Sequence, residues 1–180
     1  MKMNVPNMLT ILRVILIPFF VCFMLCNVTG YDNYIALAIF VVASLTDTLD
    51  GYLARKNHQV TNFGKFMDPL ADKLLVCSAL ICLLNNGLVG PVVVIVIMGR
   101  EFIISGFRLV AVDNGIVIAA NWWGKLKTIS QMIMIILLIL NLDGFFNVLE
   151  TAFVYIAVAL TVISLVDYIW ANRQVLNTEK

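Results

Sequence analysis

The chain has 180 residues, of which 62% are hydrophobic and only 13% are charged. This composition excludes an ordinary soluble domain, which needs more polar and charged residues to cover its surface. The formal net charge is +1, and the sequence has neither a nucleic-acid-binding module nor an aromatic–basic platform, so we expect no nucleic-acid partner.

Six apolar segments follow one another along the chain. Each has about the 20 residues that a helix needs to cross a hydrocarbon core of roughly 30 Å. They cover residues 9–26, 34–53, 66–84, 91–112, 123–142 and 148–170. Almost nothing remains for a soluble domain, and there is no internal repeat, low-complexity segment or linker. The sequence therefore predicts an all-α, integral membrane bundle of six transmembrane helices that forms a single domain over residues 1–180.

Positive charge is confined to alternate connections. The connections 27–33, 85–90 and 143–147 contain no Lys or Arg, and all 12 cations lie at the termini, in the other two connections or on the helices beside them. Cytoplasmic loops of membrane proteins are enriched in Lys and Arg. We therefore expect both termini to be cytoplasmic, and a basic cytoplasmic face suits anionic lipid head groups.

The first segment begins with a polar face. Asn7, Thr10 and Arg13 follow one another at one-turn spacing. They fit either a capped helix start, with Arg13 reaching back to the membrane interface, or a polar face directed toward an active site. Position alone slightly favours the first interpretation. Because no small-x-small cleavage site follows Cys26, we expect this span to be uncleaved.

Four aspartates lie between the second and third segments. Their pattern is Asp47-x2-Asp50-Gly51-x2-Ala54-Arg55-x8-Gly64-x3-Asp68-x3-Asp72. On helices, spacings of three and four residues place each pair of aspartates on one face. Carboxylates beside apolar stretches are costly to ionise unless they are paired, solvated or bound to a metal. The pattern therefore predicts a metal site on two adjacent helices at the membrane boundary.

The residue types of this site indicate phosphoryl chemistry. An all-oxygen site suits Mg²⁺ or Mn²⁺, whereas zinc would be expected to recruit Cys or His. Two such ions can clamp a pyrophosphate, and a remaining carboxylate can accept a proton from an attacking hydroxyl. Pro69 directly follows Asp68 and predicts a helix start or a kink there.

The fourth and fifth segments carry basic residues inside or beside apolar sequence. Arg100, Glu101 and Arg108 lie within the fourth segment, and Lys125 and Lys127 lie at the start of the fifth. Arg100 and Glu101 fit interhelical ion pairs, and Arg108 suits an anionic substrate. The two lysines fit a phosphate site at a helix N-terminus, or equally well positive-inside anchoring.

The pattern from residue 47 to residue 72 resembles the signature of the CDP-alcohol phosphotransferase family at every defined position. Those positions are Asp47, Asp50, Gly51, Ala54, Arg55, Gly64, Asp68 and Asp72. Within the family, residues 4–18, 100–108 and 124–128 resemble the bacterial phosphatidylglycerophosphate synthases. The resemblance therefore covers most of the chain.

The resemblance implies a homodimeric, six-helix enzyme of the bacterial cytoplasmic (inner) membrane, with its active site facing the cytoplasm. Such an enzyme transfers the phosphatidyl group from CDP-diacylglycerol to sn-glycerol 3-phosphate and releases CMP. It would use Mg²⁺ or Mn²⁺, as two ions.

Specific roles also follow from the resemblance. It implies that Asp47, Asp50 and Asp68 bind metal and that Asp72 is the base and a further metal ligand. It implies a CDP pocket of Gly51, Ala54, Arg55, Gly64 and Thr10, and an acceptor-phosphate site of Arg108, Lys125 and Lys127.

Two alternatives remain open at this point. The first is the same chemistry with another acceptor, namely inositol phosphate, serine, or phosphatidylglycerol as in a cardiolipin synthase. The second is an ion-coupled membrane transporter, because carboxylates inside helices also carry ions. A transporter predicts polar residues along the full membrane thickness, whereas here the charged residues cluster toward one side.

Overall fold

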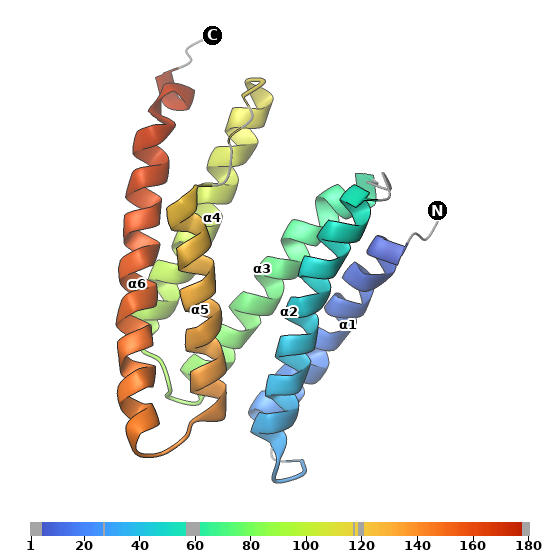
Figure 1. Cartoon of the computed structure of the whole chain (residues 1–180), viewed down its shortest axis with the longest axis vertical. Helices are drawn as coiled ribbons and strands as arrows, with labels where there is room; N and C mark the ends of the chain where they lie inside the picture. Colours follow the sequence, from blue (N-terminus) through green and yellow to red (C-terminus); the bar gives the residue numbers. More distant parts are fainter. Residues whose placement is uncertain (1–4, 27, 57–61, 117, 119–120, 178–180) are drawn as a thin grey trace. The chain divides into compact units, whose positions relative to one another are not determined.

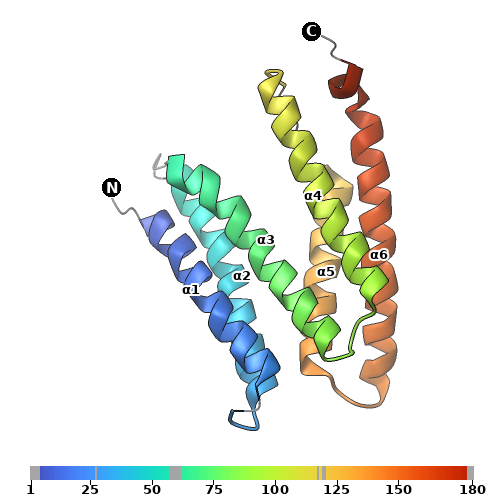
Figure 2. The same cartoon turned by 180° about the vertical axis from the view of Figure 1, so that it is seen from behind.

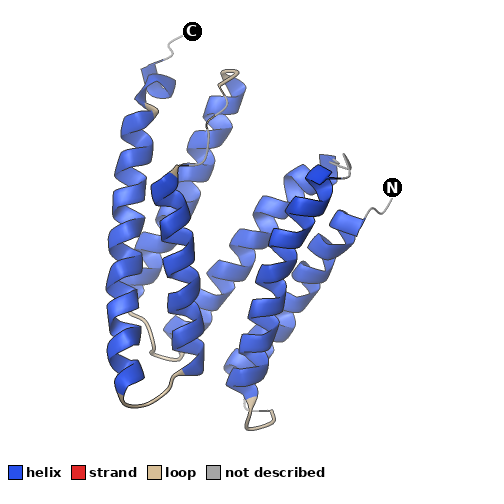
Figure 3. Cartoon of the chain, viewed as in Figure 1, coloured by secondary structure: helices blue, strands red, loops and turns tan. Residues whose placement is uncertain are grey.

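The computed structural model describes residues 5–26, 28–56, 62–116, 118 and 121–177, and for 5–6, 47–56, 62–63, 65–66 and 176–177 it describes the backbone only. These residues form α1 (Val5–Leu25), α2 (Asp32–Lys56), α3 (Asn62–Asn85), α4 (Pro91–Asp113), α5 (Trp122–Leu140), α6 (Phe145–Ala171) and the short 3-10 helix η1 (Arg173–Asn177). Within the described part of the chain every element is helical, as Figure 3 shows. The prediction of an all-α fold is confirmed.

Each of the six predicted segments corresponds to one helix. The fifth helix ends at Leu140, two residues before the predicted boundary, because Asn141 adopts a left-handed conformation with φ 45°. Pro69 lies two turns inside α3 rather than at its start. Proline removes one helical N–H donor at that point, so the backbone hydrogen bonding of α3 is interrupted close to Asp68.

The chain divides into two compact units, residues 1–88 and 89–180. In the first unit α1 packs against both α2 and α3, and α2 also contacts α3 (Figures 1 and 2). The rings of Phe20 and Phe40 join α1 to α2, with 5.8 Å between their centroids. At the end of the unit where α2 begins, the side chain of Asn86 donates a hydrogen bond to the carbonyl of Met24. The N-terminal end of α1 therefore lies beside the C-terminal end of α2 and the N-terminal end of α3.

In the second unit α6 packs against both α4 and α5 (Figure 1). Its buried apolar cluster joins α4, α6 and η1 through Ile104, Phe107, Ala111, Tyr168 and Val175. The rings of Phe107 and Tyr168 meet edge to face, with 5.8 Å between their centroids. This cluster holds the C-terminal ends of α4 and α6 together.

Among the described residues, three helical stretches are long and apolar enough to cross a membrane: Asn7–Leu25, Trp122–Leu140 and Phe145–Ala171. Large apolar side chains are exposed on the units, among them Phe19, Ile95 and Tyr155, as expected where lipid replaces water. By contrast, α3 and α4 carry charged residues within their apolar sequence. The chain is thus an α-helical membrane protein, while the count of six spans stays a prediction.

Candidate active site

The described half of the aspartate motif lies on α3. Asp68 and Asp72 occupy successive turns of the helix, and both are partly buried. The hydroxyl of Thr10, on α1, donates a hydrogen bond of 2.5 Å to Oδ1 of Asp68. Thr10 is itself completely buried. A residue from the start of the chain therefore orients a carboxylate of the motif.

The whole polar face of α1 is turned into the first unit. Asn7, Thr10 and Arg13 are all buried, and Nε of Arg13 donates a 3.2 Å hydrogen bond to the carbonyl of Ala43 in α2. The interpretation that Arg13 reaches back to the membrane interface is therefore wrong. The physical reason is that α1 packs between α2 and α3 with this face, so that its polar groups meet those helices.

The other half of the motif lies on the last turns of α2. Asp47, Asp50, Gly51, Ala54 and Arg55 belong to that helix, but their side chains lie outside the described residues. Gly64 is on the first turn of α3 and is buried. The two halves of the motif therefore lie at the same end of the first unit.

The described donors suit a hard divalent cation in type, because Asp68 and Asp72 supply only oxygen atoms. Among the described side chains, no group of three His, Cys, Asp or Glu residues could hold a metal ion. Asp47 and Asp50 are outside that set, so the full predicted ligand group stays a prediction.

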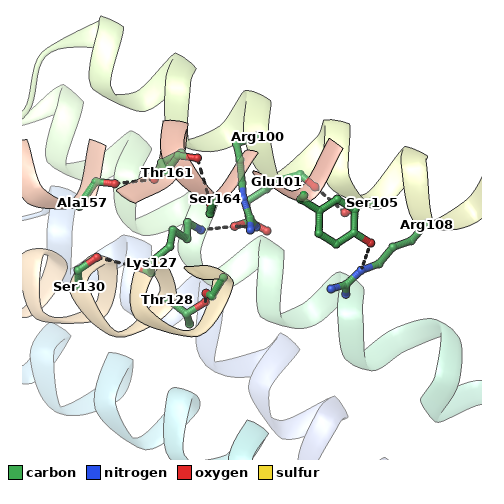
Figure 4. Close-up of polar contacts among 12 residues, drawn as sticks. Arg100, Glu101, Ser105, Arg108, Lys127, Thr128, Ser130, Ala157, Thr161 and Ser164 are labelled. Carbon is green, nitrogen blue, oxygen red and sulfur yellow. Dashed lines mark hydrogen bonds and ion pairs between the residues drawn. The ribbon is translucent and has the colours of Figure 1, made fainter. Parts of the chain in front are cut away.

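The second unit contains a largely buried group of three charged side chains. Lys127 on α5 forms an ion pair with Glu101 on α4, and Nη1 of Arg100 lies 3.3 Å from Oε1 of the same carboxylate (Figure 4). Lys127 is 2% exposed. The interhelical ion pair expected of Glu101 is confirmed. Anchoring at a charged membrane surface does not explain Lys127, because its ammonium group lies inside the unit.

Arg108 and Lys125 are exposed, unlike Lys127. Nε of Arg108 donates a 3.1 Å hydrogen bond to the hydroxyl of Tyr168 on α6. Nζ of Lys125 lies 5.4 Å from the centroid of the Trp122 ring, one turn away on α5. Each cationic group is thus held by an aromatic side chain on one side.

Two contacts of this region were not predicted from the sequence. Tyr168 binds Arg108 across 60 residues of chain, and the Asn121 side chain, at the N-cap of α5, donates a hydrogen bond to Asp167 on α6. The almost continuous apolar sequence of α6 gives no sign of either contact. An Asp-Tyr pair near the C-terminal end of a membrane helix is the only available signal, and it is equally typical of an interfacial position.

Residues 3–163 match the family described as CDP-alcohol phosphatidyltransferase. A Bacillus subtilis protein named CDP-diacylglycerol–glycerol-3-phosphate 3-phosphatidyltransferase is 44% identical, over 97% of this chain and 98% of that protein. Proteins of the same name from Haemophilus influenzae and Shigella flexneri are 39% and 37% identical, over 94% and 96% of this chain and 93% and 97% of their own lengths. Together with the aspartate pattern on α2 and α3, this match places the chain in the CDP-alcohol phosphatidyltransferase family.

Proposed function

We propose that the chain transfers the phosphatidyl group of CDP-diacylglycerol to sn-glycerol 3-phosphate, giving phosphatidylglycerophosphate and CMP. The observation that carries the proposal is 44% identity, over 97% of the chain, to a relative named for this reaction. The buried polar face of α1 supports it, because Thr10 holds a carboxylate of the motif in place.

In the proposed mechanism the acceptor hydroxyl attacks the phosphorus that carries the lipid. Asp72 takes the proton of that hydroxyl, the new oxygen–phosphorus bond forms, and the bond to the CMP oxygen breaks. Asp47, Asp50 and Asp68, with Asp72 as a further ligand, would hold two Mg²⁺ or Mn²⁺ ions. When bound, these ions neutralise charge on the pyrophosphate and on the leaving oxygen.

The remaining residues are proposed to bind the two substrates. Gly51, Ala54, Arg55 and Gly64, with Thr10, would form the CDP pocket, in which the small residues allow close approach of the nucleotide. Arg108, Lys125 and Lys127 would supply positive charge for the acceptor phosphate. The exposed guanidinium and ammonium groups of Arg108 and Lys125 support this assignment.

We further propose the setting of this reaction. The chain would act as one domain over residues 1–180, with six transmembrane helices, in a homodimer of the bacterial inner membrane. Both termini and the aspartate motif would face the cytoplasm, where CDP-linked lipid head groups and glycerol phosphate are accessible. The absence of Lys and Arg from the connections 27–33, 85–90 and 143–147 supports this orientation.

The test is an acceptor panel. Purified protein receives CDP-diacylglycerol and Mg²⁺, and then sn-glycerol 3-phosphate, inositol phosphate, serine or phosphatidylglycerol in separate reactions, with CMP release as the measurement. We expect release with sn-glycerol 3-phosphate well above that with the other acceptors. A preference for any other acceptor would refute the substrate assignment, and ion flux without CMP release would indicate a transporter.

A further inference from the structure

Glu101 links two cations in the second unit. Its Oε1 atom pairs with Nζ of Lys127 on the neighbouring helix and with Nη1 of Arg100 beside it in the sequence (Figure 4). The Arg100 and Glu101 side chains are 11% and 19% exposed. One carboxylate therefore fixes two cationic groups, from α4 and α5, at one place.

The charges of these three residues do not cancel. Two cations and one carboxylate lie together in a largely buried position, and a buried cation is costly unless an anion accompanies it. Nε of Arg100 is also buried and lacks a hydrogen-bond acceptor among the described residues. Two cations and an unused guanidinium donor at the same place suit an anionic ligand.

The start of α5 adds to this environment. A Cβ atom added to Gly124 would lie 3.5 Å from Nη2 of Arg100, so the guanidinium group rests against the first turn of that helix. The positive end of the helix dipole lies in the same turn and favours negative charge. The hydrogen bond from Asn121 to Asp167 ties this turn to α6. The cations are thus held on a fixed support.

We infer that Glu101 is a positioning residue for the acceptor phosphate. It does not contact the acceptor; it holds Arg100 and Lys127 so that their positive groups meet a phosphate monoester. This inference rests on the proposed function. It also revises the part played by Lys127, whose ammonium group acts through its pairing with Glu101.

The test compares substrate requirements in Glu101 variants of the full chain. Glu101→Gln keeps the size of the side chain and removes its charge, so we expect the KM for sn-glycerol 3-phosphate to rise about tenfold or more, the effect of losing a charge-assisted hydrogen bond. The KM for CDP-diacylglycerol should stay within about twofold of the original, which is the scatter expected without a lost contact. Equal changes in both KM values, or an unchanged acceptor KM, would overturn the inference.

Two further variants separate positioning from folding. Glu101→Asp keeps the charge on a shorter side chain and should restore the acceptor KM to within about threefold, less than 1 kcal/mol. Glu150→Gln is the matched control, since Glu150 is another buried glutamate of the same unit, and neither KM should change. If Glu101→Gln yields no folded protein, Glu101→Ala takes its place: an acceptor KM that rises no more than the lipid KM in that variant refutes the positioning role.

A binding measurement separates this inference from the proposed function. Inorganic phosphate should raise the thermal unfolding temperature of the original protein, and glycerol at equal concentration should not. Glu101→Gln should lose the phosphate effect. If no phosphorylated acceptor supports CMP release, the proposed function fails, but loss of phosphate stabilisation in the variant would still support the positioning role. Equal stabilisation of both proteins, or of neither, would overturn it.

Discussion

Each unit holds a charge of opposite sign to the groups that are proposed to meet substrate there. The first unit, which carries the aspartates, buries the cation Arg13, and the second, which carries the basic residues, contains the largely buried carboxylate of Glu101. Unbalanced charge in an apolar bundle costs free energy. A residue of opposite sign therefore lowers the free energy needed to bring like charges together nearby.

The two charges are nevertheless held differently. Nε of Arg13 donates to a neutral backbone carbonyl of α2, whereas Glu101 pairs with two cations from α4 and α5. Through Nε, Arg13 therefore joins α1 to the backbone of α2. Glu101, by contrast, pairs with both Arg100 and Lys127. It therefore reduces the repulsion between these two cations and also holds them in position. Variants in each unit can show whether the acidic and basic groups have separate roles.

Asp72→Asn is expected to have the largest effect. A base in the transition state contributes roughly 10²- to 10⁴-fold, so turnover should fall by about that factor. CDP-diacylglycerol should still bind, because the substitution keeps the size of the side chain. CMP release and equilibrium binding of the lipid, measured on the same preparation, test both statements.

The matched control for that experiment is Asp32→Asn in the same unit. Asp32 lies at the start of α2, at the opposite end of the unit from Asp68 and Asp72, and its carboxylate binds the preceding loop. Turnover should be unaffected there. Full activity of Asp72→Asn would end the assignment of the base.

Arg108→Ala should show the second largest effect, and this effect should be confined to the KM for the acceptor. Removal of a cationic contact to phosphate costs about 1.5–3 kcal/mol, so the KM for sn-glycerol 3-phosphate should rise about tenfold to a hundredfold. The KM for CDP-diacylglycerol should hardly change. Steady-state kinetics with each substrate varied in turn would measure both.

Tyr168→Phe sharpens this result, since it removes only the hydroxyl that accepts the hydrogen bond from Arg108. The loss of one hydrogen bond, about 0.5–1.5 kcal/mol, should raise the acceptor KM by a smaller factor than Arg108→Ala. If Arg108→Ala raised both KM values equally, the second unit would not contain a separate site for the acceptor phosphate.

The fold was predictable to a large extent, and the outcome at particular residues shows why. Apolar runs of membrane length specify helices almost without ambiguity, since every backbone polar group must be satisfied internally. The six segments accordingly matched α1 to α6. The burial of Arg13 was not predictable, because a polar residue near a helix start fits both an interface and a helix–helix contact.

The candidate site was predictable to a smaller extent. The spacing of Asp68 and Asp72 placed them on one face, because helical periodicity is local. The pairing of Lys127 with Glu101 joins two helices, and the contact of Arg108 with Tyr168 joins α4 to α6, so neither leaves a periodic pattern in the sequence. Contacts of this kind depend on helix packing, which one sequence does not specify.

Thr10→Val tests the aspartate motif of the first unit with a smaller expected effect. Valine has the shape of threonine but cannot donate the 2.5 Å hydrogen bond to Asp68. A hydrogen bond to a charged group is worth about 1.5–3 kcal/mol, and turnover should fall by about tenfold at the lower end of that range. Thr10→Ser keeps the hydroxyl and should retain most of the activity. A loss equal in both variants would indicate a packing defect instead of an orienting role for the hydroxyl.

Asp32 should show the smallest effect, limited to stability in acid. Partial burial of its carboxylate opposes ionisation, but hydrogen bonds from the N–H groups of Thr29, Gly30 and Val28 and from the Thr29 hydroxyl outweigh it and lower the pKa of Asp32. A carboxylate with a lowered folded-state pKa adds stability above its unfolded-state pKa, roughly 4. That contribution disappears as the pH falls through the lower, folded-state pKa.

Thermal unfolding of the original protein and of Asp32→Asn, followed from pH 7 to pH 3, measures this contribution. The difference between the two should be constant down to about pH 5 and should shrink below about pH 4, where the carboxylate begins to protonate. Turnover at neutral pH should be equal, because Asp32 lies at the other end of the unit from Asp68. A turnover defect in Asp32→Asn would contradict the separation between structural and catalytic carboxylates in the first unit.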